Sequence, residues 1–190
     1  NALLNENRVM TSHVPGTTRD TISVNFHYKD ADITLIDTAG LRKKRNVERY
    51  GVERLSVEQA TTAISSADVV ALVVDVNMML ESQDLKIASL AIKNGKPLVL
   101  VVNKIDTVKN DKDFAYIQDE IKYLSQIKLT AIKTLHIIYV SAIRSENITQ
   151  ILDKAIEVHA LWSKKISTAR LNEWLMGIVA AHQPPLTKSG

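Results

Sequence analysis

The sequence predicts an α/β fold with a mostly parallel sheet and helices on both of its faces. Four short, largely apolar runs at residues 33–36, 69–74, 98–102 and 137–140 are predicted strands. The second and third runs are apolar at every position, as expected for parallel strands that are covered on both faces. Amphipathic segments lie between the runs, and such alternation of strands with helices is typical of this fold class.

Residues 22–36 have a different pattern, in which apolar and polar side chains alternate from Ile22 to Lys29. A period of two with one polar face indicates a strand that is exposed to water on one side. Residues 29–32, with the sequence KDAD, are predicted to turn the chain into the next strand. We therefore expect a hairpin with one antiparallel edge strand.

Apolar residues recur at helical spacing over residues 52–67, 85–92, 114–124 and 148–159. These stripes predict four amphipathic helices, each with one face packed against the sheet. His159 lies on the last stripe, and we expect it to be packed in the core.

The tail predicts one further helix, because Ser167 and Thr168 can cap a first helical turn with a side-chain oxygen. The apolar face of this helix consists of Leu171, Trp174, Leu175, Ile178 and Val179. We expect residues 1–165 to form one domain and residues 166–190 to be the first helix and linker of a C-terminal domain.

The composition is that of a globular protein, since 45% of the 190 residues are hydrophobic and 24% are charged. The absence of cysteine excludes disulfides and thiolate metal sites, and it is compatible with the cytoplasm, where we expect the protein to be. No apolar run approaches the roughly 20 residues that a membrane helix needs, so we expect no membrane partner. The net charge of +3 supports a nucleic-acid partner only weakly.

A carboxylate stands directly after the predicted strand 33–36, in the sequence D-T-A-G at residues 37–40. Ligands of open α/β sheets bind beyond the carboxyl ends of the strands. In a nucleotide site Asp37 can hold Mg²⁺ through water, and Gly40 lets a backbone N–H approach a terminal phosphate closely. Taken alone, D-x-x-G is common, and a plain turn explains it better.

The sequence N-K-I-D at residues 103–106 follows the predicted strand 98–102. The carboxylate of Asp106 can accept two parallel hydrogen bonds from the N1–H and N2–H₂ groups of guanine, which adenine does not offer. The stem of Lys104 can cover the base while its ammonium stays in water, and Asn103 can join neighbouring loops. A solvated loop explains this tetrapeptide equally well.

Two further motifs complete the series. Ser141 and Ala142 follow the predicted strand 137–140, and a backbone N–H of this pair could reach guanine O6. In the loop at residues 16–20, GTTRD, a threonine hydroxyl can join a Mg²⁺ shell and sense a γ-phosphate, although a glycine turn alone explains the loop better. Because the four motifs come in order and the last three each follow a strand, a guanine nucleotide site is the better interpretation.

These motifs resemble the Ras-like P-loop GTPases of the group that contains Der, Era and MnmE. Residues 15–20 and the D-T-A-G sequence match Der and MnmE, whereas Era usually has proline where Ala39 stands. Residues 42–44, followed by residues 52–57, are similar to the second G domain of the Der (EngA) family. The stretch at residues 166–172 is similar to the start of the KH-like domain of that family, so the resemblance covers essentially the whole chain.

The resemblance implies roles for particular residues. By this analogy Thr18 ligates Mg²⁺, Asp37 supports the metal and Gly40 contacts the γ-phosphate, so that Thr18 and Gly40 are the catalytic positions. A K⁺ ion would bind beside the loop from Ser12 to Thr17, with Thr17 as a ligand, and would neutralise charge in the transition state. The implied GTP-binding set is Ser12, Thr17, Thr18, Asp37, Thr38, Ala39, Gly40, Leu41, Asn103, Lys104, Asp106, Ser141 and Ala142.

Two departures from the P-loop pattern shape the expected activity. Leu41 stands where Ras-type enzymes carry a glutamine that orients water, so we expect slow unaided hydrolysis. The chain contains no G-x-x-x-x-G-K-[ST] phosphate loop. We expect this piece to lack the first, central strand and the phosphate loop of a longer protein, and to be inactive alone. Tight binding of labelled GTP by the isolated chain would contradict that expectation.

The resemblance implies a GTPase that converts GTP to GDP and phosphate and acts in biogenesis of the large ribosomal subunit. The expected partners are that subunit and its rRNA, with another G domain and a KH-like domain in the full-length chain. A run of basic residues such as 42–45 is usually a solvated loop, but its place beside D-x-x-G favours contact with rRNA phosphates or a neighbouring domain. Two alternatives remain: a tRNA-modification GTPase similar to MnmE, and a nucleotide-free interaction module.

Overall fold

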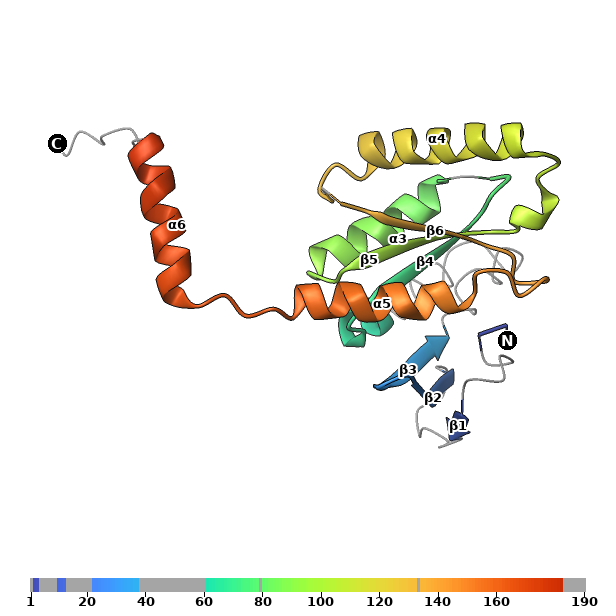
Figure 1. The fold of residues 1–190 in the computed structure, drawn as a ribbon, viewed down its shortest axis with the longest axis horizontal. Helices are drawn as coiled ribbons and strands as arrows, with labels where there is room; N and C mark the ends of the chain where they lie inside the picture. The colour runs from blue at the N-terminus through green and yellow to red at the C-terminus, as the bar shows by residue number, and fades with distance from the viewer. Residues whose placement is uncertain are drawn as a thin grey trace, which may run out of the picture. The chain divides into compact units, whose positions relative to one another are not determined.

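The computed structural model divides the chain into two compact units, Asn1–His159 and Ala160–Gly190 (Figure 1). The second unit is the smaller of the two. The residues that the structure describes are 2–3, 10–12, 22–37, 61–78, 80–132 and 134–182.

A parallel three-stranded sheet forms the centre of the first unit. Its strands are β4 (Val70–Asp75), β5 (Leu98–Asn103) and β6 (His136–Val140), in the order β4-β5-β6. The register places Asp75 opposite Asn103, and Asn103 opposite Val140. The carboxyl ends of the three strands therefore form one row along an edge of the sheet.

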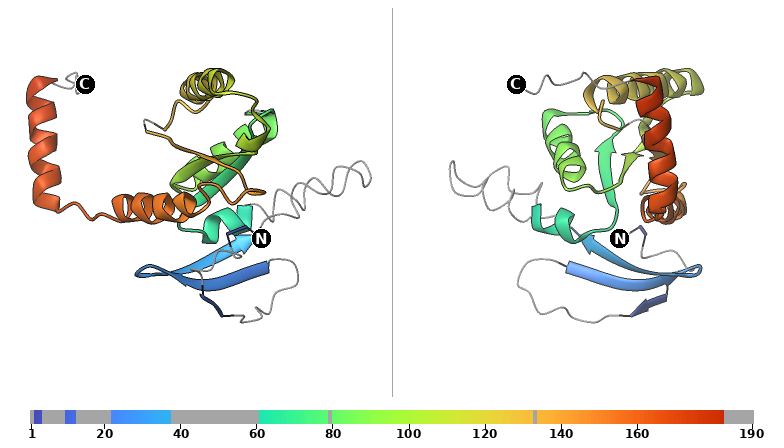
Figure 2. Two further views of the ribbon diagram at one scale, coloured as in Figure 1. Left: turned by 45° about the vertical axis from the view of Figure 1, so that its right-hand side comes forward. Right: turned by 90° about the vertical axis from the view of Figure 1, so that its left-hand side faces the viewer.

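Helices lie on both faces of this sheet, as predicted (Figures 1 and 2). The expectation that the run 69–74 is covered on both faces was wrong, because Ala71 and Val73 of β4 are exposed. On one face, α3 (Ser82–Lys93) and α4 (Asp111–Lys128) pack against a cluster that includes Leu98, Leu100 and Val102. On the other face, α5 (Thr149–Trp162) packs against a cluster that includes Val99 and Val101. Successive residues of β5 thus point to opposite helical layers, which explains why this strand is apolar throughout.

Local signals set the beginnings of two of these helices. Asn110 caps α4, because its side-chain oxygen accepts a hydrogen bond of 2.9 Å from the backbone N–H of Asp113. Glu81 and Asp84 form a reciprocal capping box at the start of α3. A short 3₁₀ helix, η2 (Ile105–Thr107), follows β5 directly.

The predicted hairpin is present, but within the described residues it belongs to a separate antiparallel sheet with the order β1-β2-β3, and it does not form the expected edge of the parallel sheet. The strands of the antiparallel sheet are β1 (Met10–Ser12), β2 (Ile22–Tyr28) and β3 (Ala31–Asp37). Phe26 and Tyr28 are buried while Asn25 and His27 are exposed, so the alternation in β2 reflects one buried and one solvent-exposed face. The described strands of the unit therefore form one parallel and one antiparallel sheet.

Two details of the hairpin sheet differ from the sequence prediction. The turn consists of residues 29 and 30 alone, because Ala31 and Asp32 already pair with Tyr28 and His27. Lys29 adopts the left-handed conformation, with φ of 53°, which lets the two strands join tightly. Strand β1 was not predicted, and Ser12, expected in a loop, is its last residue.

The helical prediction for residues 52–67 is described only in part. Residues 61–66 are helical, and Ile64 is buried in the cluster beneath α3 and α4, whereas residues 52–60 lie outside the described part of the chain. The prediction for His159 was wrong, because this side chain is exposed although its neighbour Val158 is buried. Near the end of α5 the buried position is Val158, which packs in the same cluster as Val99 and Val101.

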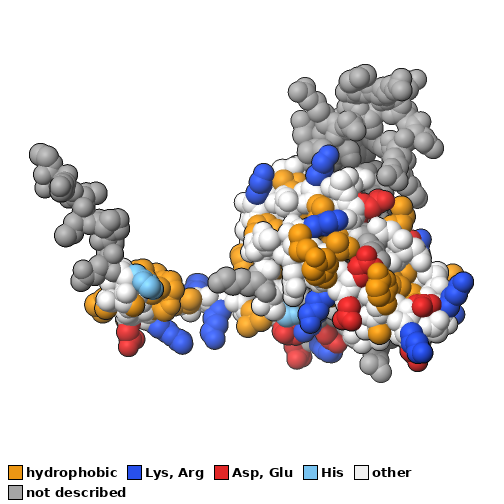
Figure 3. All heavy atoms as spheres, turned by 90° about the horizontal axis from the view of Figure 1, so that it is seen from above, with side chains coloured by type: hydrophobic (Ala, Val, Ile, Leu, Met, Phe, Trp, Pro, Cys, Tyr) orange, Lys and Arg blue, Asp and Glu red, His pale blue; other side chains and the backbone are white. Residues whose placement is uncertain are grey.

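The outer side of α4 is exposed and mixed in character. Tyr116, Tyr123 and Ile127 are more than half exposed, whereas Ile121 is fully buried against the sheet. Figure 3 views the side of this unit on which α4 lies in Figure 1, and shows apolar side chains among both signs of charge.

The second unit contains α6 (Thr168–Ala181), which confirms the helix predicted in the tail. Ser167 is its N-cap and accepts a hydrogen bond of 3.4 Å from the backbone N–H of Arg170. The apolar side chains of α6 that the sequence singled out are all exposed, from Leu171 to Val179. Among the described residues, no helix combines the length and the apolar character that crossing a membrane requires.

Candidate functional site

The described part of the candidate site lies at the row of strand ends formed by Asp75, Asn103 and Val140. Lys104 and Asp106 follow β5, and Ser141 and Ala142 follow β6, so neighbouring strands carry both loops to one edge. This edge is where ligands bind in open α/β sheets. The structure thus brings together the five predicted residues Asn103, Lys104, Asp106, Ser141 and Ala142.

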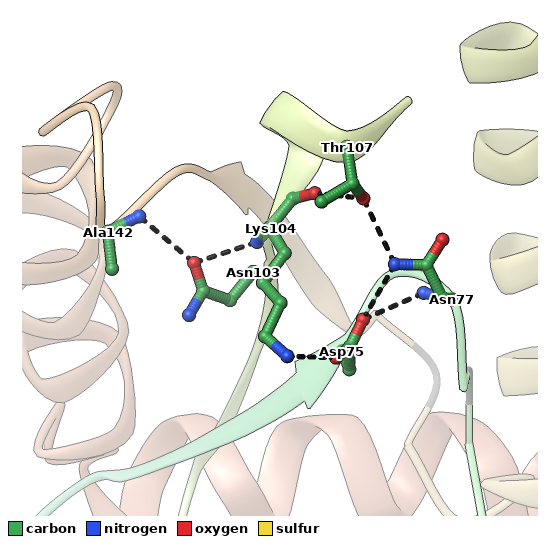
Figure 4. Close-up of polar contacts among 6 residues, drawn as sticks. All are labelled: Asp75, Asn77, Asn103, Lys104, Thr107 and Ala142. Carbon is green, nitrogen blue, oxygen red and sulfur yellow. Dashed lines mark hydrogen bonds and ion pairs between the residues drawn. The ribbon is translucent and has the colours of Figure 1, made fainter. Parts of the chain in front are cut away.

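Asn103 joins the two loops through one atom. Its Oδ1 accepts hydrogen bonds from the backbone N–H of Lys104 at 2.8 Å and from that of Ala142 at 3.0 Å (Figure 4). Asn103 therefore joins two neighbouring loops, as its place after a predicted strand indicated. Two donors on one oxygen hold the loops after β5 and β6 at a set separation.

Asp106 lies in η2 and contacts the loop after β6. The hydroxyl of Ser141 donates a hydrogen bond of 2.5 Å to Oδ1 of Asp106, and Ser141 is fully buried. The backbone N–H of Arg144 in turn donates to the Ser141 Oγ at 3.2 Å. This chain of contacts orients the carboxylate of Asp106, which retains acceptor capacity for other donors because a carboxylate has about four lone-pair sites.

The backbone N–H groups of Ser141 and Ala142 both donate within the protein. Ser141 donates to the carbonyl oxygen of Glu146 at 3.1 Å, and Ala142 donates to Asn103. A contact from this pair to a guanine O6 would therefore have to share or replace one of these hydrogen bonds.

Lys104 adopts the left-handed conformation, with φ of 71°. Its carbonyl oxygen accepts hydrogen bonds from both the backbone N–H and the hydroxyl of Thr107, at 3.0 and 2.8 Å. Its ammonium forms an ion pair of 2.5 Å with Oδ2 of Asp75. Backbone and side chain of Lys104 are thus both held in place.

Three residues of this network were missed by the sequence analysis: Asp75, Asn77 and Thr107 (Figure 4). Asp75 Oδ1 accepts from the backbone N–H and the side-chain amide of Asn77, and that amide also donates to Thr107 Oγ1 at 3.0 Å. Burial acts to raise the pKa of Asp75, but hydrogen bonds from Lys104 and Asn77 outweigh it and hold the pKa below its ordinary value. A signal was available, since Asp75 follows an apolar strand just as Asp37 and Asn103 do.

The other predicted site residues are described only in part or not at all. Asp37 is the last residue of β3, so its backbone stands at a strand end as predicted. The predicted residues that lie outside the described part of the chain are Thr17, Thr18, Thr38, Ala39, Gly40 and Leu41. Within the residues that are described, no cluster of three or more His, Asp or Glu could hold a metal ion. The Mg²⁺ and K⁺ sites stay predictions.

Comparison with known proteins begins with a family model. The model described as "50S ribosome-binding GTPase" matches residues 1–104 of this chain. This match covers more than half of the 190 residues, and it includes β5 together with Asn103 and Lys104.

Curated relatives match the chain along its whole length. GTPase Der of Rickettsia akari (strain Hartford) is 42% identical over 190 residues, which are 100% of this chain and 42% of that protein. GTPase Der of Rickettsia felis is 41% identical over the same shares of the two chains. The chain therefore spans 42% of the length of these relatives.

Solved structures support the fold. A crystal structure of Era in complex with MgGDPNP and part of 16S ribosomal RNA has a TM-score of 0.60 at 24% identity, covering 83% of this chain and 50% of that chain. Aquifex aeolicus Era bound to GDP and AlF4⁻ also has a TM-score of 0.60, at 23% identity and covering 83% and 52%. Elongation factor SelB from Methanococcus maripaludis has a TM-score of 0.57 at 18% identity, covering 79% and 30%.

Proposed function

Because the chain belongs to the 50S ribosome-binding GTPase family, we propose that the intact protein binds GTP and hydrolyses it to GDP and phosphate. The observation that carries the proposal is the junction at Asn103, whose side chain joins the loop of Lys104 and Asp106 to the loop of Ser141 and Ala142. These loops would form the base pocket, at the edge of the sheet where such ligands bind.

Guanine recognition would depend on Asp106. A carboxylate can accept two parallel charge-assisted hydrogen bonds from N1–H and N2–H₂ of guanine, and adenine lacks this pair of donors. The contact from Ser141 supports this role, because it orients the carboxylate before a base arrives. The stem of Lys104 would cover one face of the base.

Apart from Ser12 and Asp37, the residues proposed to bind the phosphates and the metal ions lie outside the described part of the chain. Thr18 and Asp37 would hold Mg²⁺, because a hydroxyl and a carboxylate are the hard oxygen donors that this ion prefers, and Asp37 stands at the end of β3. Bound there, Mg²⁺ would neutralise charge on the phosphates. Gly40 would contact the γ-phosphate, and Thr38, Ala39 and Leu41 would complete that loop.

A monovalent cation is the proposed substitute for an arginine or glutamine in hydrolysis. Leu41 cannot orient water by hydrogen bonding, so the charge that develops in phosphoryl transfer needs another source of stabilisation. K⁺ beside Ser12 and Thr17 would supply it.

The cellular role is proposed for the intact protein. The family description names the 50S subunit, which supports binding to the large ribosomal subunit and its rRNA and a role in biogenesis of that subunit. The match to 42% of each relative supports a longer intact chain. By family analogy, its further parts would be another G domain, a phosphate loop and a KH-like domain from residue 166 onward. We place this protein in the cytoplasm. A tRNA-modification role is not favoured, since the relatives cited above are named GTPase Der.

Changing Asp106→Asn in the intact protein tests the proposal. Asparagine presents a donor where guanine also donates, so we expect GTP to bind at least about 100-fold more weakly while XTP, which offers an acceptor there, binds better. Equilibrium binding of both nucleotides, and of ATP, to the unsubstituted and variant proteins measures the change.

The matched control is Glu157→Gln, which removes one carboxylate charge from an exposed ion pair on α5 and should leave all three affinities unchanged. Equal affinity of the unsubstituted protein for ATP and GTP, or an Asp106→Asn variant with no gain for XTP, would rule out this base recognition.

A further inference from the structure

We propose that Asp75 is a positioning residue for guanine nucleotide binding, which acts by holding the side chain and the loop of Lys104 in place. This inference rests on the proposed function, because Lys104 is the residue whose stem would cover the base. Neither the sequence motif at residues 103–106 nor its spacing includes Asp75, which lies 29 positions before Lys104.

The first observation is the ion pair between Asp75 and Lys104. Asp75 is the last residue of β4, and the parallel register places it beside Asn103, the residue before Lys104. Oδ2 of Asp75 lies 2.5 Å from the ammonium of Lys104. The side chain of Asp75 is only 16% exposed while that of Lys104 is 57% exposed, so a fixed, largely buried anchor holds a long and otherwise mobile side chain.

The second observation is that the other carboxylate oxygen of Asp75 is connected, through Asn77, to Thr107 in the loop that follows Lys104. Oδ1 accepts from the backbone N–H of Asn77 at 2.9 Å and from its side-chain amide at 3.1 Å. That amide donates to Thr107, whose hydroxyl donates to the carbonyl oxygen of Lys104. Figure 4 shows the closed circuit from Asp75 through Asn77 and Thr107 back to Lys104.

The backbone adds a third link between the same segments. The N–H of Val76 donates to the carbonyl oxygen of Asn103 at 2.9 Å, which continues the pairing of β4 with β5 past the end of the strands. The end of β4, which carries Asp75, is therefore held against the end of β5, which leads directly to Lys104.

The consequence is pre-organisation of Lys104. A free lysine side chain samples many rotamers, and a base that packs against it must order it. Asp75 orders the stem before the nucleotide arrives, so loss of the anchor weakens binding without removing any group that touches the nucleotide.

A double-mutant cycle on the intact protein tests this role, with Asp75→Asn, Lys104→Met and the double variant. Methionine keeps an apolar stem and removes the ammonium that Asp75 holds. We expect Asp75→Asn to raise the Kd for fluorescently labelled GDP about three- to tenfold when Lys104 is present, and less than about 1.5-fold on the Lys104→Met background. Asp75→Glu, which retains a carboxylate, should recover part of the affinity and also serves if the asparagine variant does not fold.

The outcomes separate positioning from a purely structural role. Equal weakening by Asp75→Asn on both backgrounds, a loss of binding that follows a lower melting temperature of the nucleotide-free protein, or an unchanged Kd on the Lys104 background would each overturn the proposal. Absence of GDP binding by the unsubstituted protein would instead refute the proposed function, and the Asp75 role with it.

Discussion

Asn103 shows how one polar atom can organise a site. Its Oδ1 is the shared acceptor for the N–H groups of Lys104 and Ala142, which belong to loops on different strands. The linking role of Asn103 could be predicted from the sequence, because the motif N-K-I-D directly follows a predicted strand. The partner on the second loop depended on the register between β5 and β6, which places Asn103 opposite Val140.

Replacing Asn103 by alanine should release both N–H groups. We expect amide hydrogen exchange at Lys104 and Ala142 to become roughly tenfold faster in the nucleotide-free intact protein, because each hydrogen bond contributes on the order of 1 kcal/mol. Exchange monitored residue by residue provides the measurement.

Asn103→Asp is the matched control, since it retains side-chain oxygen acceptors at the same position. Exchange at the two amides should stay within a factor of about two of the unsubstituted protein. If alanine leaves both amides as protected as before, the side chain of Asn103 does not hold the loops together.

At the scale of elements, the hairpin of β2 and β3 is attached to α5 by a polar and an apolar contact. The hydroxyl of Tyr28 donates to Oδ1 of Asp153 at 3.0 Å, and the ammonium of Lys29 pairs with the same carboxylate. Phe26, Tyr28 and Leu152 form a small buried cluster beside these contacts. Tyr28 and Asp153 are 125 positions apart in the sequence, so no local pattern could reveal their contact.

We expect Asp153→Ala to destabilise the attachment of the hairpin by about 1 kcal/mol, because the buried Tyr28 side chain loses its hydrogen-bond partner. Glu157→Ala, one turn further along α5, removes an exposed ion pair with Lys154 and should cost much less, because water screens exposed ion pairs. Hydrogen exchange of the amides of β2 and β3 measures both variants. A cost of Asp153→Ala no greater than that of Glu157→Ala would show that the contact is not structural.

The same attachment should weaken in acid. The hydrogen bond from Lys29 lowers the pKa of Asp153, and so does the one from Tyr28. A carboxyl group with a lowered folded-state pKa contributes stability above its ordinary pKa of about 4, and this stability is lost as the pH falls through the lowered value. We compare the free energy that attaches the hairpin in the unsubstituted protein and in Asp153→Ala. The difference between these two free energies should be constant near neutral pH and should shrink below about pH 4.

The ends of a strand were predictable wherever the sequence contains an unbroken apolar run. The predicted strands that became β4, β5 and β6 lie within one residue of the observed bounds at each end, because each is marked by an unbroken apolar run. Only β5 is buried almost throughout, whereas Ala71 and Val73 of β4 are exposed. Strand β1 has only three residues and no run of its own, so its pairing with β2 decided it.

At the scale of the whole molecule, the described strands form two sheets that differ in the direction of pairing. β3 pairs antiparallel with β2, while β4 pairs parallel with β5. The proposed phosphate end depends on the strand that ends at Asp37, and the proposed base pocket depends on the parallel sheet. Hydrolysis is therefore a property that we assign to the intact protein, in which both ends act on one nucleotide.

The intact protein should hydrolyse GTP faster in K⁺ than in Na⁺, by about tenfold or more, because a correctly sized cation would stabilise the transition-state charge that Leu41 cannot. Rates of phosphate release, compared at equal ionic strength with chloride as the shared anion, measure the effect. GTP affinity in the two salts is the control and should change much less than the rate. Equal rates would contradict the proposed cation site.

The sequence by itself determined the alternation of strands and helices, the solvent-exposed face of β2 and the order of the motifs. These features follow from side-chain periodicity and from residue types at strand ends, which are local properties of the chain. The tertiary structure alone decided that Asp75 holds Lys104 and that Asp153 holds Tyr28 and Lys29. Such contacts depend on strand register and on helix packing. These bring residues that are far apart in the sequence close together in space, and local sequence patterns do not reveal them.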